Sequence, residues 1–364
     1  MTRVLLSAAL AFVAAIAVPA SAAPPVVATP NSEPPSAEPP SAEPPIRVVS
    51  FNIRFENRTD AENAWGARRH RAIQHLLDSG ADFIGLQEVL PSQRRELVEG
   101  LPAWGSIGRS REASSAEGES TPIFYDRRRW SLVDGRSGTF WLSETPSVPG
   151  SRDWKTASPR IATWAVLRET RSGRLVMVVN THLDDRSQEA RENGAKVIAK
   201  FLAREAERMP VIVMGDFNAG PLNPARSSLC EGWQGSPPLR DCYAIARAGN
   251  ESAAGTYHGF KGGTGGLRID AILASEHFDI VEASISHTPE GEKHLSDHYP
   301  VTASLRLKST GDGESRSAPI APEAPRDALG AAPPKEPSRP KPPKSPTPPS
   351  LPSRPTPPSS DPGR

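Results

Sequence analysis

Residues 210–218 read PVIVMGDFN, an apolar run that ends abruptly in polar residues. Val211, Ile212 and Val213 are β-branched, which is typical of a strand buried inside a sheet. Asp216 and Asn218 follow two residues apart, so in an extended chain both side chains point to the same face. A carboxylate that can polarise a water and an amide that can bind a phosphate oxygen predict a phosphoester-cleaving site, although Asp and Asn also end strands by making turns.

Similar short apolar runs recur along the chain and predict further strands, at residues 47–51, 83–88, 121–125, 161–167, 175–181, 269–274, 280–286 and 301–307. A helical repeat of apolar residues predicts helices at 62–77 and 188–207. Many strands with a few long helices favour the α/β class, with β-sheets packed face to face and helices outside. No Pro-, Gly- or Ser-rich linker interrupts residues 46–308, so we expect one domain there.

Both ends of the chain differ from this domain. Residues 1–23 combine Arg3, an apolar run and the small residues ASA at 20–22, which predicts a signal peptide and therefore export. The apolar run is too short for a confident membrane span, so we expect no membrane insertion. Residues 24–45 and 309–364 are rich in proline and poor in large apolar side chains. This composition predicts a disordered N-terminal spacer and a disordered basic tail, which could contact the cell envelope.

Charge and cysteine content narrow the expected partners. The chain has 43 Lys and Arg residues against 42 Asp and Glu residues. A protein that binds duplex DNA usually carries a basic face, so balanced totals argue against a nuclease without excluding a local patch at Arg127–Arg129.

The two cysteines, Cys230 and Cys242, lack CxxC spacing. In an oxidising compartment a disulfide between them is favoured over two free thiols.

Polar residues stand at the edges of six apolar runs, in the order FNIR (51–54), QEV (87–89), NTHL (180–183), GDFN (215–218), RID (268–270) and SDHYP (296–300). One carboxylate or histidine at the edge of a strand is ordinary, but this many in one domain indicate a shared site. The motifs and their order resemble the endonuclease/exonuclease/phosphatase superfamily. The resemblance covers essentially all of residues 46–308.

The resemblance implies a four-layer α/β/β/α sandwich, in which helices flank two central mixed β-sheets and the site lies across the ends of both sheets. It also implies Mg²⁺, or Mn²⁺ in its place, with Glu88 as the main ligand, Asn52 as support, and Asp297 assisting the metal or the water. A hard divalent ion held by carboxylates, with waters and substrate oxygens retained, is the usual binding mode of Mg²⁺.

The same resemblance implies catalytic roles for the remaining motif residues. Asp216 would orient and deprotonate the attacking water, and Asn218 would bind the phosphoryl group. His298 would stabilise charge on the phosphoryl oxygens or act as the base. Asp270 would pair with a histidine, either His182 or His298, and fix its tautomer. His182 would hydrogen-bond a phosphate oxygen or protonate the leaving group.

Two further residues are candidates for binding the substrate phosphate. Arg160, in SPRIATW, leads into a predicted strand and could reach a phosphate, although a structural arginine fits the pattern equally well. Tyr125, in IFYD, lies on a strand that often lines the site in the superfamily, and a packing role is as good an interpretation.

Together these observations predict an exported, monomeric, metal-dependent phosphoesterase in which water attacks the phosphorus directly, without a covalent intermediate. A small organophosphate monoester or diester is the favoured substrate. An extracellular nuclease is one alternative, because the superfamily hosts several substrate classes on one fold. A non-catalytic envelope protein tethered by its proline-rich ends is the other. The set Glu88, Asp216, Asn218, Asp270 and His298 argues against it, since a binding protein has no evident need for all five.

Overall fold

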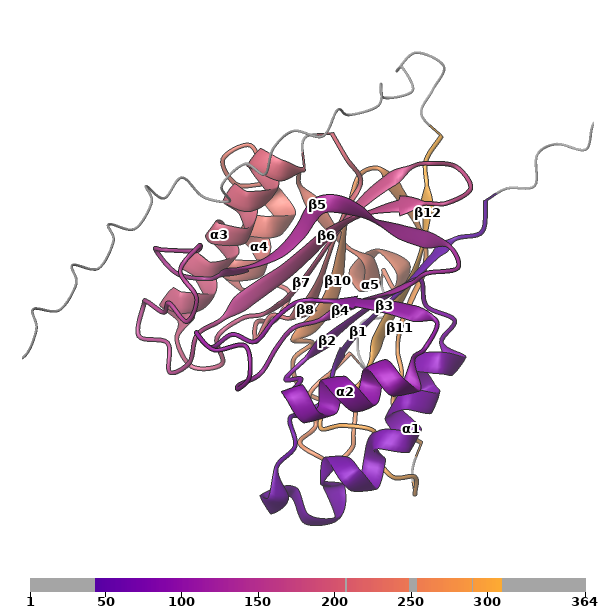
Figure 1. Ribbon diagram of the computed structural model, residues 1–364, viewed down its shortest axis with the longest axis vertical. Helices are drawn as coiled ribbons and strands as arrows, with labels where there is room; N and C mark the ends of the chain where they lie inside the picture. Colours follow the sequence, from indigo (N-terminus) through magenta and orange to yellow (C-terminus); the bar gives the residue numbers. More distant parts are fainter. Residues whose placement is uncertain (1–42, 207, 249–253, 290, 310–364) are drawn as a thin grey trace, which may run out of the picture. The chain divides into compact units, whose positions relative to one another are not determined.

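Two six-stranded β-sheets form the centre of the protein in the computed structural model, which describes residues 43–206, 208–248, 254–289 and 291–309 (Figure 1). The strands of the first sheet are, in spatial order, β11 (Phe278–Ile285), β12 (Val301–Leu307), β1 (Ile46–Asn52), β2 (Phe83–Gln87), β4 (Ile123–Asp126) and β3 (Trp104–Ile107). Those of the second sheet are β5 (Trp130–Trp141), β6 (Ile161–Glu169), β7 (Leu175–His182), β8 (Val211–Asp216), β10 (Asp270–Ser275) and β9 (Leu239–Asp241). The predicted signal peptide, and most of the predicted spacer and tail, lie outside the described residues.

Helices cover the outer face of each sheet. α1 (Trp65–Asp78) and α2 (Pro91–Gly100) pack on the first sheet, whereas α3 (Gln188–Glu205) and α4 (Pro224–Glu231) pack on the second. Figure 1 shows the two helix pairs on opposite sides of the strands. The short helix α5 (Cys242–Ala246) and the 3₁₀ turn η1 (Arg58–Asn63) complete the set. The predicted four-layer α/β/β/α sandwich is therefore confirmed.

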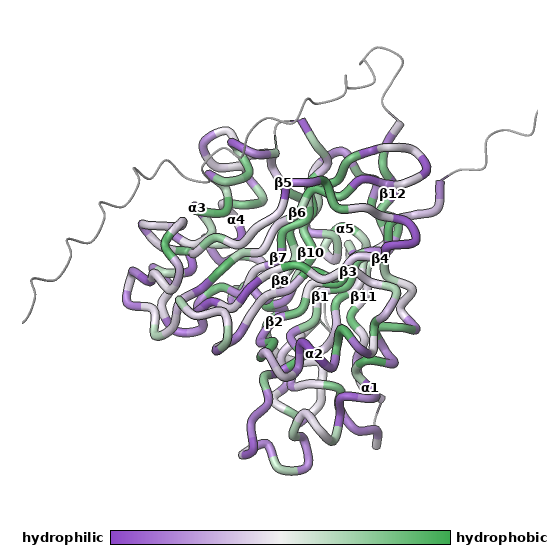
Figure 2. Tube along the Cα trace, viewed as in Figure 1, coloured by the Kyte–Doolittle hydropathy of each residue, from purple (hydrophilic) through white to green (hydrophobic). Residues whose placement is uncertain are grey.

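The central strands are apolar on both faces because each face meets a different layer. Val178 and Ile212 pack in the core between the sheets, while their neighbours Val179 and Val213 pack against the helices on the other side. Successive side chains of a strand point to opposite faces, so a strand covered on both sides needs a continuous apolar run. Figure 2 shows this hydrophobic colouring along the central strands.

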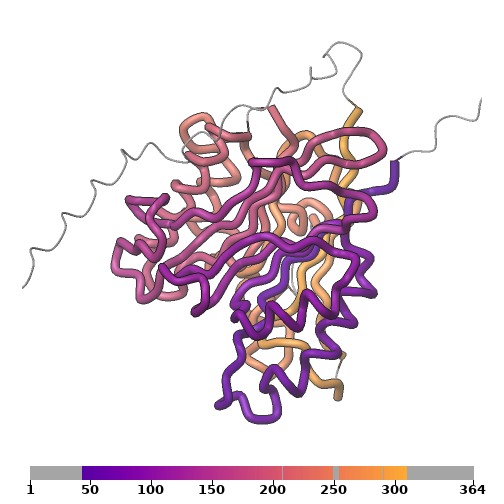
Figure 3. The backbone as a smooth tube through the Cα atoms, viewed as in Figure 1, coloured from indigo at the N-terminus to yellow at the C-terminus, as the bar shows by residue number. Residues whose placement is uncertain are grey.

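The parallel strand pairs bring the polar motifs to one end of the sheets. β1 runs parallel to β2, with Asn52 opposite Gln87, and β7 runs parallel to β8, with His182 opposite Asp216. β10 runs antiparallel to β8, so Asp270, its first residue, also pairs with Asp216. The chain begins in the first sheet, crosses to the second and returns, so that β12 lies beside β1 (Figure 3).

Some elements were not predicted from the sequence. These are β3, β5, β9, α2 and α4, together with the shorter α5 and η1. In α2, only Gln93 and Leu97 are buried, which leaves too few apolar residues to form a periodic stripe. β5 contains an irregularity in its pairing with β6 between Leu132 and Ser137, which breaks the strand alternation.

The predicted disulfide is absent, since Cys230 and Cys242 are both free thiols in the structure. Cys230, in α4, packs against the core between the second sheet and its helices. Cys242, in α5, belongs to the core between the two sheets. The two thiols thus belong to different layers of the sandwich.

Within the residues that the structure describes, no helix combines the length and the apolar character needed to cross a bilayer.

Candidate active site

Five polar residues meet where strands of the two sheets end or begin. Asn52 and Glu88 lie at the ends of β1 and β2, His182 and Asp216 close β7 and β8, and Asp270 opens β10. Both sheets therefore contribute to one group of side chains, as the sequence predicted. Burial of this many polar groups is costly unless they hydrogen-bond or bind a ligand, so their partners show what the site can do.

His298 is held in its charged form. Its Nδ1 lies 2.8 Å from Oδ2 of Asp270, and its Nε2 lies 3.8 Å from Oδ2 of Asp216. Burial alone would lower the pKa of His298, but the charges of Asp270 and Asp216 outweigh it and raise the pKa to about 10. At neutral pH this side chain is an imidazolium, which can donate a proton but cannot accept one. The geometry therefore favours charge stabilisation by His298 over the role of base.

Asp216 is the most perturbed carboxylate of the group. It accepts hydrogen bonds from the backbone N–H of Asn218 at 2.8 Å and from Nδ2 of Asn52 at 3.1 Å. Burial and the nearby charge of Asp270 raise the pKa of Asp216 to about 7, although His298 and these hydrogen bonds oppose the shift. A carboxylate that titrates near neutral pH is suited to take a proton from water.

His182 differs from His298 in protonation. Its Nε2 lies 3.5 Å from Oδ2 of Asp216. Burial lowers the pKa of His182 well below its usual value, and the charges of Arg160 and Arg111 lower it further. His182 is therefore neutral, and Asp216 has a neutral histidine on one side and a charged one on the other.

Glu88 and Asp297 form the second half of the site. Oε1 of Glu88 accepts a hydrogen bond from Nδ2 of Asn52 at 3.0 Å, and Oε2 accepts one from the backbone of Phe55 at 3.1 Å. Asn52 thus bridges Glu88 and Asp216, because the same amide donates to both carboxylates. Arg54, which was not predicted, lies 4.0 Å from Glu88 and 3.8 Å from Asp297. A positive charge between these two acids offsets their mutual repulsion.

The backbone of the site is strained. Arg54, Glu88 and Asn218 have φ values of 57°, 62° and 47°, in the left-handed region. Asn tolerates this region, whereas such a conformation costs Arg and Glu on the order of 1–3 kcal/mol each. At Gly215 the neighbouring strand approaches so closely that a Cβ atom would lie 2.1 Å from the carbonyl oxygen of Thr181. Packing of the surrounding elements maintains these conformations, which place Glu88 beside Asn52 and the backbone N–H of Asn218 beside Asp216.

A narrow cavity, here called the site cavity, opens beside Glu88 and His182. Arg111, Glu119 and Arg160 complete its polar lining. Arg160 donates to Asp185 at 2.6 Å and Arg111 to Glu119 at 2.7 Å. Nη1 of Arg160 and Nε of Arg111 are nevertheless buried without a hydrogen-bond partner. Nε of Arg111 lies 3.6 Å from Glu112, so Nη1 of Arg160 is the clearer donor for an anion in this cavity.

The remaining predicted residues are placed as follows. Nδ2 of Asn218 donates to the carbonyl of Leu183 at 3.0 Å, so Asn218 links the ends of β7 and β8. The structure does not bring Tyr125 to the site, because Tyr125 pairs with Phe83 at the start of β2. Four residues of strand separate Phe83 from Gln87, which is roughly 13 Å. Tyr125 packs against the core between the sheets instead.

Two groups of side chains could hold the divalent cation that the family implies. Ligand atoms of Asp216, Asp270 and His298 lie within 4.8 Å of one another, and Oδ1 of Asp270 is buried without a partner. The sequence did not assign the metal to this group. Glu88 and Asp297, which it did assign, offer a second set that consists of oxygen atoms alone. As an imidazolium, His298 offers no lone pair to a cation, so the oxygen-only set Glu88 and Asp297 suits Mg²⁺ better.

Sequence reasoning missed three residues of the site. Arg54 belongs to the FNIR motif, so its position beside the predicted ligands was an available signal. Arg111 and Glu119 lie between β3 and β4 in a stretch without any recognisable pattern. They reach the site cavity only because this stretch folds back toward the end of β2, where Ser120 pairs with Val89.

Comparisons with known proteins agree with this geometry. A sequence model of the endonuclease/exonuclease/phosphatase family matches residues 49–298. The structure is similar to that of an endonuclease/exonuclease/phosphatase from Bacteroides vulgatus, with 32% identity, a TM-score of 0.65 and coverage of 72% of this chain and 99% of that one. It is also similar to a mannosyl-6-phosphatase from Bacteroides thetaiotaomicron, with 28% identity, a TM-score of 0.62 and coverage of 71% and 99%.

Among curated proteins, Nocturnin from Drosophila melanogaster is 26% identical over 176 residues, which are 45% of this chain and 26% of Nocturnin. The match thus spans about a quarter of that relative's length. The family match extends from β1 to His298 and so includes every strand end described above. On this match, on the fold and on the geometry of the site, the chain belongs to the endonuclease/exonuclease/phosphatase family of phosphoric ester hydrolases.

Proposed function

We propose that this protein is an exported, Mg²⁺-dependent phosphoesterase that hydrolyses a small organophosphate monoester or diester by direct attack of water. One observation carries the proposal. Asp216, whose pKa is raised to about 7, lies between a neutral and a charged histidine, beside a cavity with unsatisfied guanidinium nitrogens. This arrangement offers a proton acceptor, two proton donors and an anion site within one enclosure.

The water that attacks the phosphorus would lose its proton to Asp216. Asn52 and the backbone of Asn218 hold the Asp216 carboxylate in place. Its pKa lies close to the working pH, so the carboxylate accepts a proton in the transition state and releases it afterwards. No side chain needs to bond to phosphorus in this scheme, which keeps the reaction a single in-line displacement.

The two histidines would act on the phosphate oxygens. As an imidazolium, His298 donates its Nδ1 proton to Asp270, and its Nε2 also carries a proton, which it would donate to an oxygen on which negative charge develops. His182 is neutral and would hydrogen-bond another oxygen or protonate the leaving group. Arg160 and Arg111 would hold the phosphate through their unsatisfied nitrogens.

The divalent ion would neutralise phosphate charge and stabilise the leaving oxygen, which is the usual contribution of Mg²⁺ to phosphoryl transfer. Glu88 and Asp297 would hold it, with Asn52 fixing the orientation of Glu88. The group Asp216, Asp270 and His298 is the alternative position for this ion.

The site cavity has a volume of about 10 Å³, which is room for one water, so it does not select the size of the substrate. Similarity to a mannosyl-6-phosphatase supports a phosphate ester of a small molecule as the substrate class. The proposal that the protein is exported rests on the sequence of residues 1–23 alone.

Turnover by the full chain tests the proposal. Four substrates are compared in the presence of Mg²⁺ or EDTA: bis(4-nitrophenyl) phosphate, 4-nitrophenyl phosphate, plasmid DNA and sphingomyelin. We expect turnover of one nitrophenyl ester that is lost in EDTA and in His298→Ala, and retained in Arg171→Gln, which changes an exposed arginine in the turn between β6 and β7. Turnover of plasmid DNA alone would replace the proposal by a nuclease. Activity that is indifferent to EDTA and to His298→Ala would refute it.

A further inference from the structure

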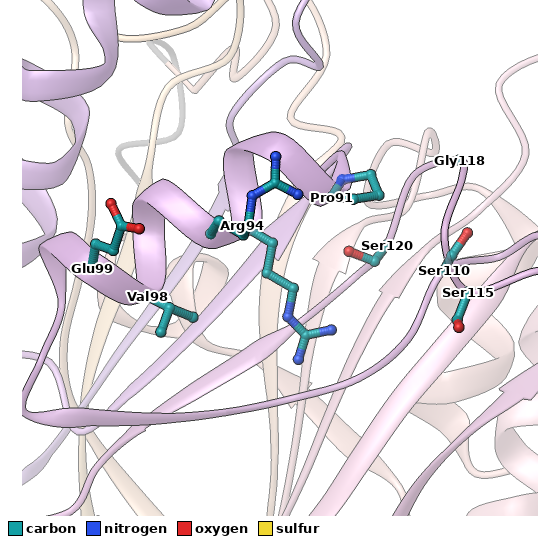
Figure 4. Close-up of a pocket in the computed structure, with 9 residues that line it drawn as sticks. Pro91, Arg94, Val98, Glu99, Ser110, Ser115, Gly118 and Ser120 are labelled. Carbon is teal, nitrogen blue, oxygen red and sulfur yellow. The ribbon is translucent and has the colours of Figure 1, made fainter.

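A second and larger cavity lies outside the site described above. It has a volume of about 420 Å³ and lies, open to solvent, between α2 and the loop formed by residues 110–120 (Figure 4). Arg94, Arg95 and Val98 line it from the helix, and Ser115, Gly118 and Ser120 line it from the loop. Cavities of this volume are typical of sites for small molecules. We call it the α2 cavity.

One stretch of backbone separates the α2 cavity from the site cavity. Gly118 lines the α2 cavity, Glu119 and Thr121 line the site cavity, and Ser120 lines both, so this residue is shared by the two cavities. Ser120 also pairs through its backbone with Val89, the residue next to Glu88. A ligand in the α2 cavity would therefore contact the wall that positions Glu119 and Glu88.

Two arginines of the α2 cavity, Arg94 and Arg95, form no ion pair within the described residues. The Arg94 guanidinium donates to the carbonyl of Gly108 and, at 3.2 Å, to Oγ of Ser106, both of which are uncharged. Burial lowers the pKa of Arg94, with no carboxylate acting to raise it. Across the described part of the chain, no carboxylate lies within ion-pair distance of Arg94 or Arg95. Glu99, on the next turn of α2, is the one acid among the residues that line the cavity.

Several enclosed arginines of the protein are paired with an acid: Arg111 donates to Glu119, Arg160 to Asp185, and Arg226 to Asp241. Arg68, which is buried, instead donates to four backbone carbonyls. Arg94 has fewer such partners than Arg68 and borders a cavity. A half-buried guanidinium without a counterion is unfavourable, because it has lost part of its hydration and gained no opposite charge. An anionic ligand would supply the missing charge through hydrogen bonds that Arg95, which makes none in the structure, is free to form.

We propose that the α2 cavity binds a small molecule that carries a phosphate or carboxylate group on an apolar body. Arg95 and Arg94 bind the anionic group, and the side chains of Val98 and Pro91 contact the apolar part. The anionic group belongs either to the distal part of the substrate or to a separate small molecule. Binding itself does not depend on the proposed function, whereas assigning the ligand to the substrate does rest on it.

Calorimetric titration with phenylphosphonate tests the binding, since this probe has the required chemistry and its C–P bond resists hydrolysis. The full-length wild type is compared with Arg95→Gln, Arg94→Gln and the control Arg171→Gln, in which an exposed arginine remote from both cavities is changed. We expect, in the wild type and in Arg171→Gln, a binding event that Arg95→Gln weakens at least tenfold, in addition to any binding at the active site, which Arg95→Gln leaves unchanged. Arg95 is exposed and makes no contact that folding requires, so this variant stays informative if Arg94→Gln misfolds. Equal affinities in wild type and Arg95→Gln would overturn the proposal.

Kinetics identify the source of the anion. Glucose 6-phosphate and glucose 1,6-bisphosphate are compared as substrates. If the cavity holds the distal part of the substrate, Arg95→Gln raises KM for the bisphosphate about tenfold and leaves KM for the monophosphate and both kcat values unchanged. If it holds a separate molecule, Arg95→Gln leaves both KM values unchanged, and phenylphosphonate changes the turnover of 4-nitrophenyl phosphate in the wild type only. Failure of every substrate to react would count against the proposed function, and the titration would still decide the binding.

Discussion

At the scale of single residues, Asp270 controls the protonation of the site. Replacing it by asparagine removes the charge that faces Nδ1 of His298. Burial, which alone lowers the pKa of His298, is then opposed by Asp216 and Asp297 only. We expect His298 in Asp270→Asn to have a markedly lower pKa and kcat to fall about 10²–10⁴-fold, the usual contribution of a positioned acid. NMR titration of the histidine ring and steady-state kinetics measure both quantities.

The control for this prediction is Asp279→Asn. Asp279 is an exposed acid of β11, and its nearest cation is Lys308 at 3.9 Å. The Asp279→Asn substitution leaves the site untouched, so the kcat of this variant should equal that of the wild type. An Asp270→Asn variant with an unchanged His298 titration would show that Asp270 does not set the charge of the histidine.

His75, in α1, makes the stability of the fold dependent on pH. Burial lowers the pKa of His75, while Asp78 opposes the shift, and its Nε2 has no partner. The folded state therefore binds this proton less readily than the unfolded chain does. The contribution of neutral His75 to the free energy of unfolding is therefore fully present above the pKa of the unfolded chain, about 6.5. It is lost as the pH falls below that value. We expect His75→Leu to lose less stability than the wild type between pH 7.5 and 5.5, measured by urea unfolding.

His70→Leu provides the comparison, because His70 is an exposed histidine of the same helix. The free energy of unfolding of His70→Leu should depend on pH in the same way as that of the wild type. If His75→Leu and the wild type show the same loss of stability over this range, His75 is not the group responsible.

At the scale of elements, the pairing of β7 with β8 depends on Gly215. A methyl group there would lie 2.1 Å from the carbonyl oxygen of Thr181, the residue paired with Gly215, and the φ of 155° is one that L side chains rarely adopt. We expect Gly215→Ala to reduce the free energy of unfolding by at least about 3 kcal/mol, as severe overpacking does. Denaturant unfolding measures the change.

The same substitution at Gly66 is the matched control. Gly66 lies in the first turn of α1, and a Cβ atom there would meet no atom within 4 Å. Gly66→Ala should stabilise the protein by about 0.5–1 kcal/mol, because alanine loses less backbone entropy than glycine in a helix. Similar effects of the two substitutions would refute the steric argument.

The sequence predicted the helices and strands whose own residues carry a clear apolar pattern. β8 was predicted because both of its faces are buried, which requires a continuous apolar run. α2 was missed because it buries little of its surface, and the alternation of β5 is interrupted. The direction of a strand is not encoded locally. Tyr125 was a candidate for the site only through the family resemblance, and nothing in IFYD shows that β4 runs antiparallel to β2.

The same distinction applies to the site. Carboxylates, amides and histidines at strand ends can be read from the sequence, because parallel strands bring their ends together. Arg111 and Glu119 could not be predicted, since their position depends on how a loop packs against Val89. The raised pKa of Asp216 also follows only from burial and from the pairing of β8 with β10, which places Asp270 opposite Asp216.

At the scale of the whole molecule, a divalent ion should stabilise the fold. Burial and the charge of Glu88 raise the pKa of Asp297, although His298 and Arg54 oppose the shift, so a further cation near these acids relieves repulsion. At a Mg²⁺ concentration of 100 times Kd, the free energy of unfolding should rise by about 2.7 kcal/mol. Thermal unfolding with and without Mg²⁺ measures this gain. We expect Glu88→Gln to lose most of it and Glu144→Gln, at an exposed acid, to retain it.

The order in which the strands are synthesised differs from the order in which they pair. β1, the first strand made, lies between β2 and β12, the last strand made. Ile46 pairs with Leu305, so a chain still growing on the ribosome cannot close the first sheet until nearly the whole domain has emerged. Until then one edge of β1 stays open to pairing with another chain. The yield of this protein in a cell should therefore depend on chaperones that cover the nascent chain.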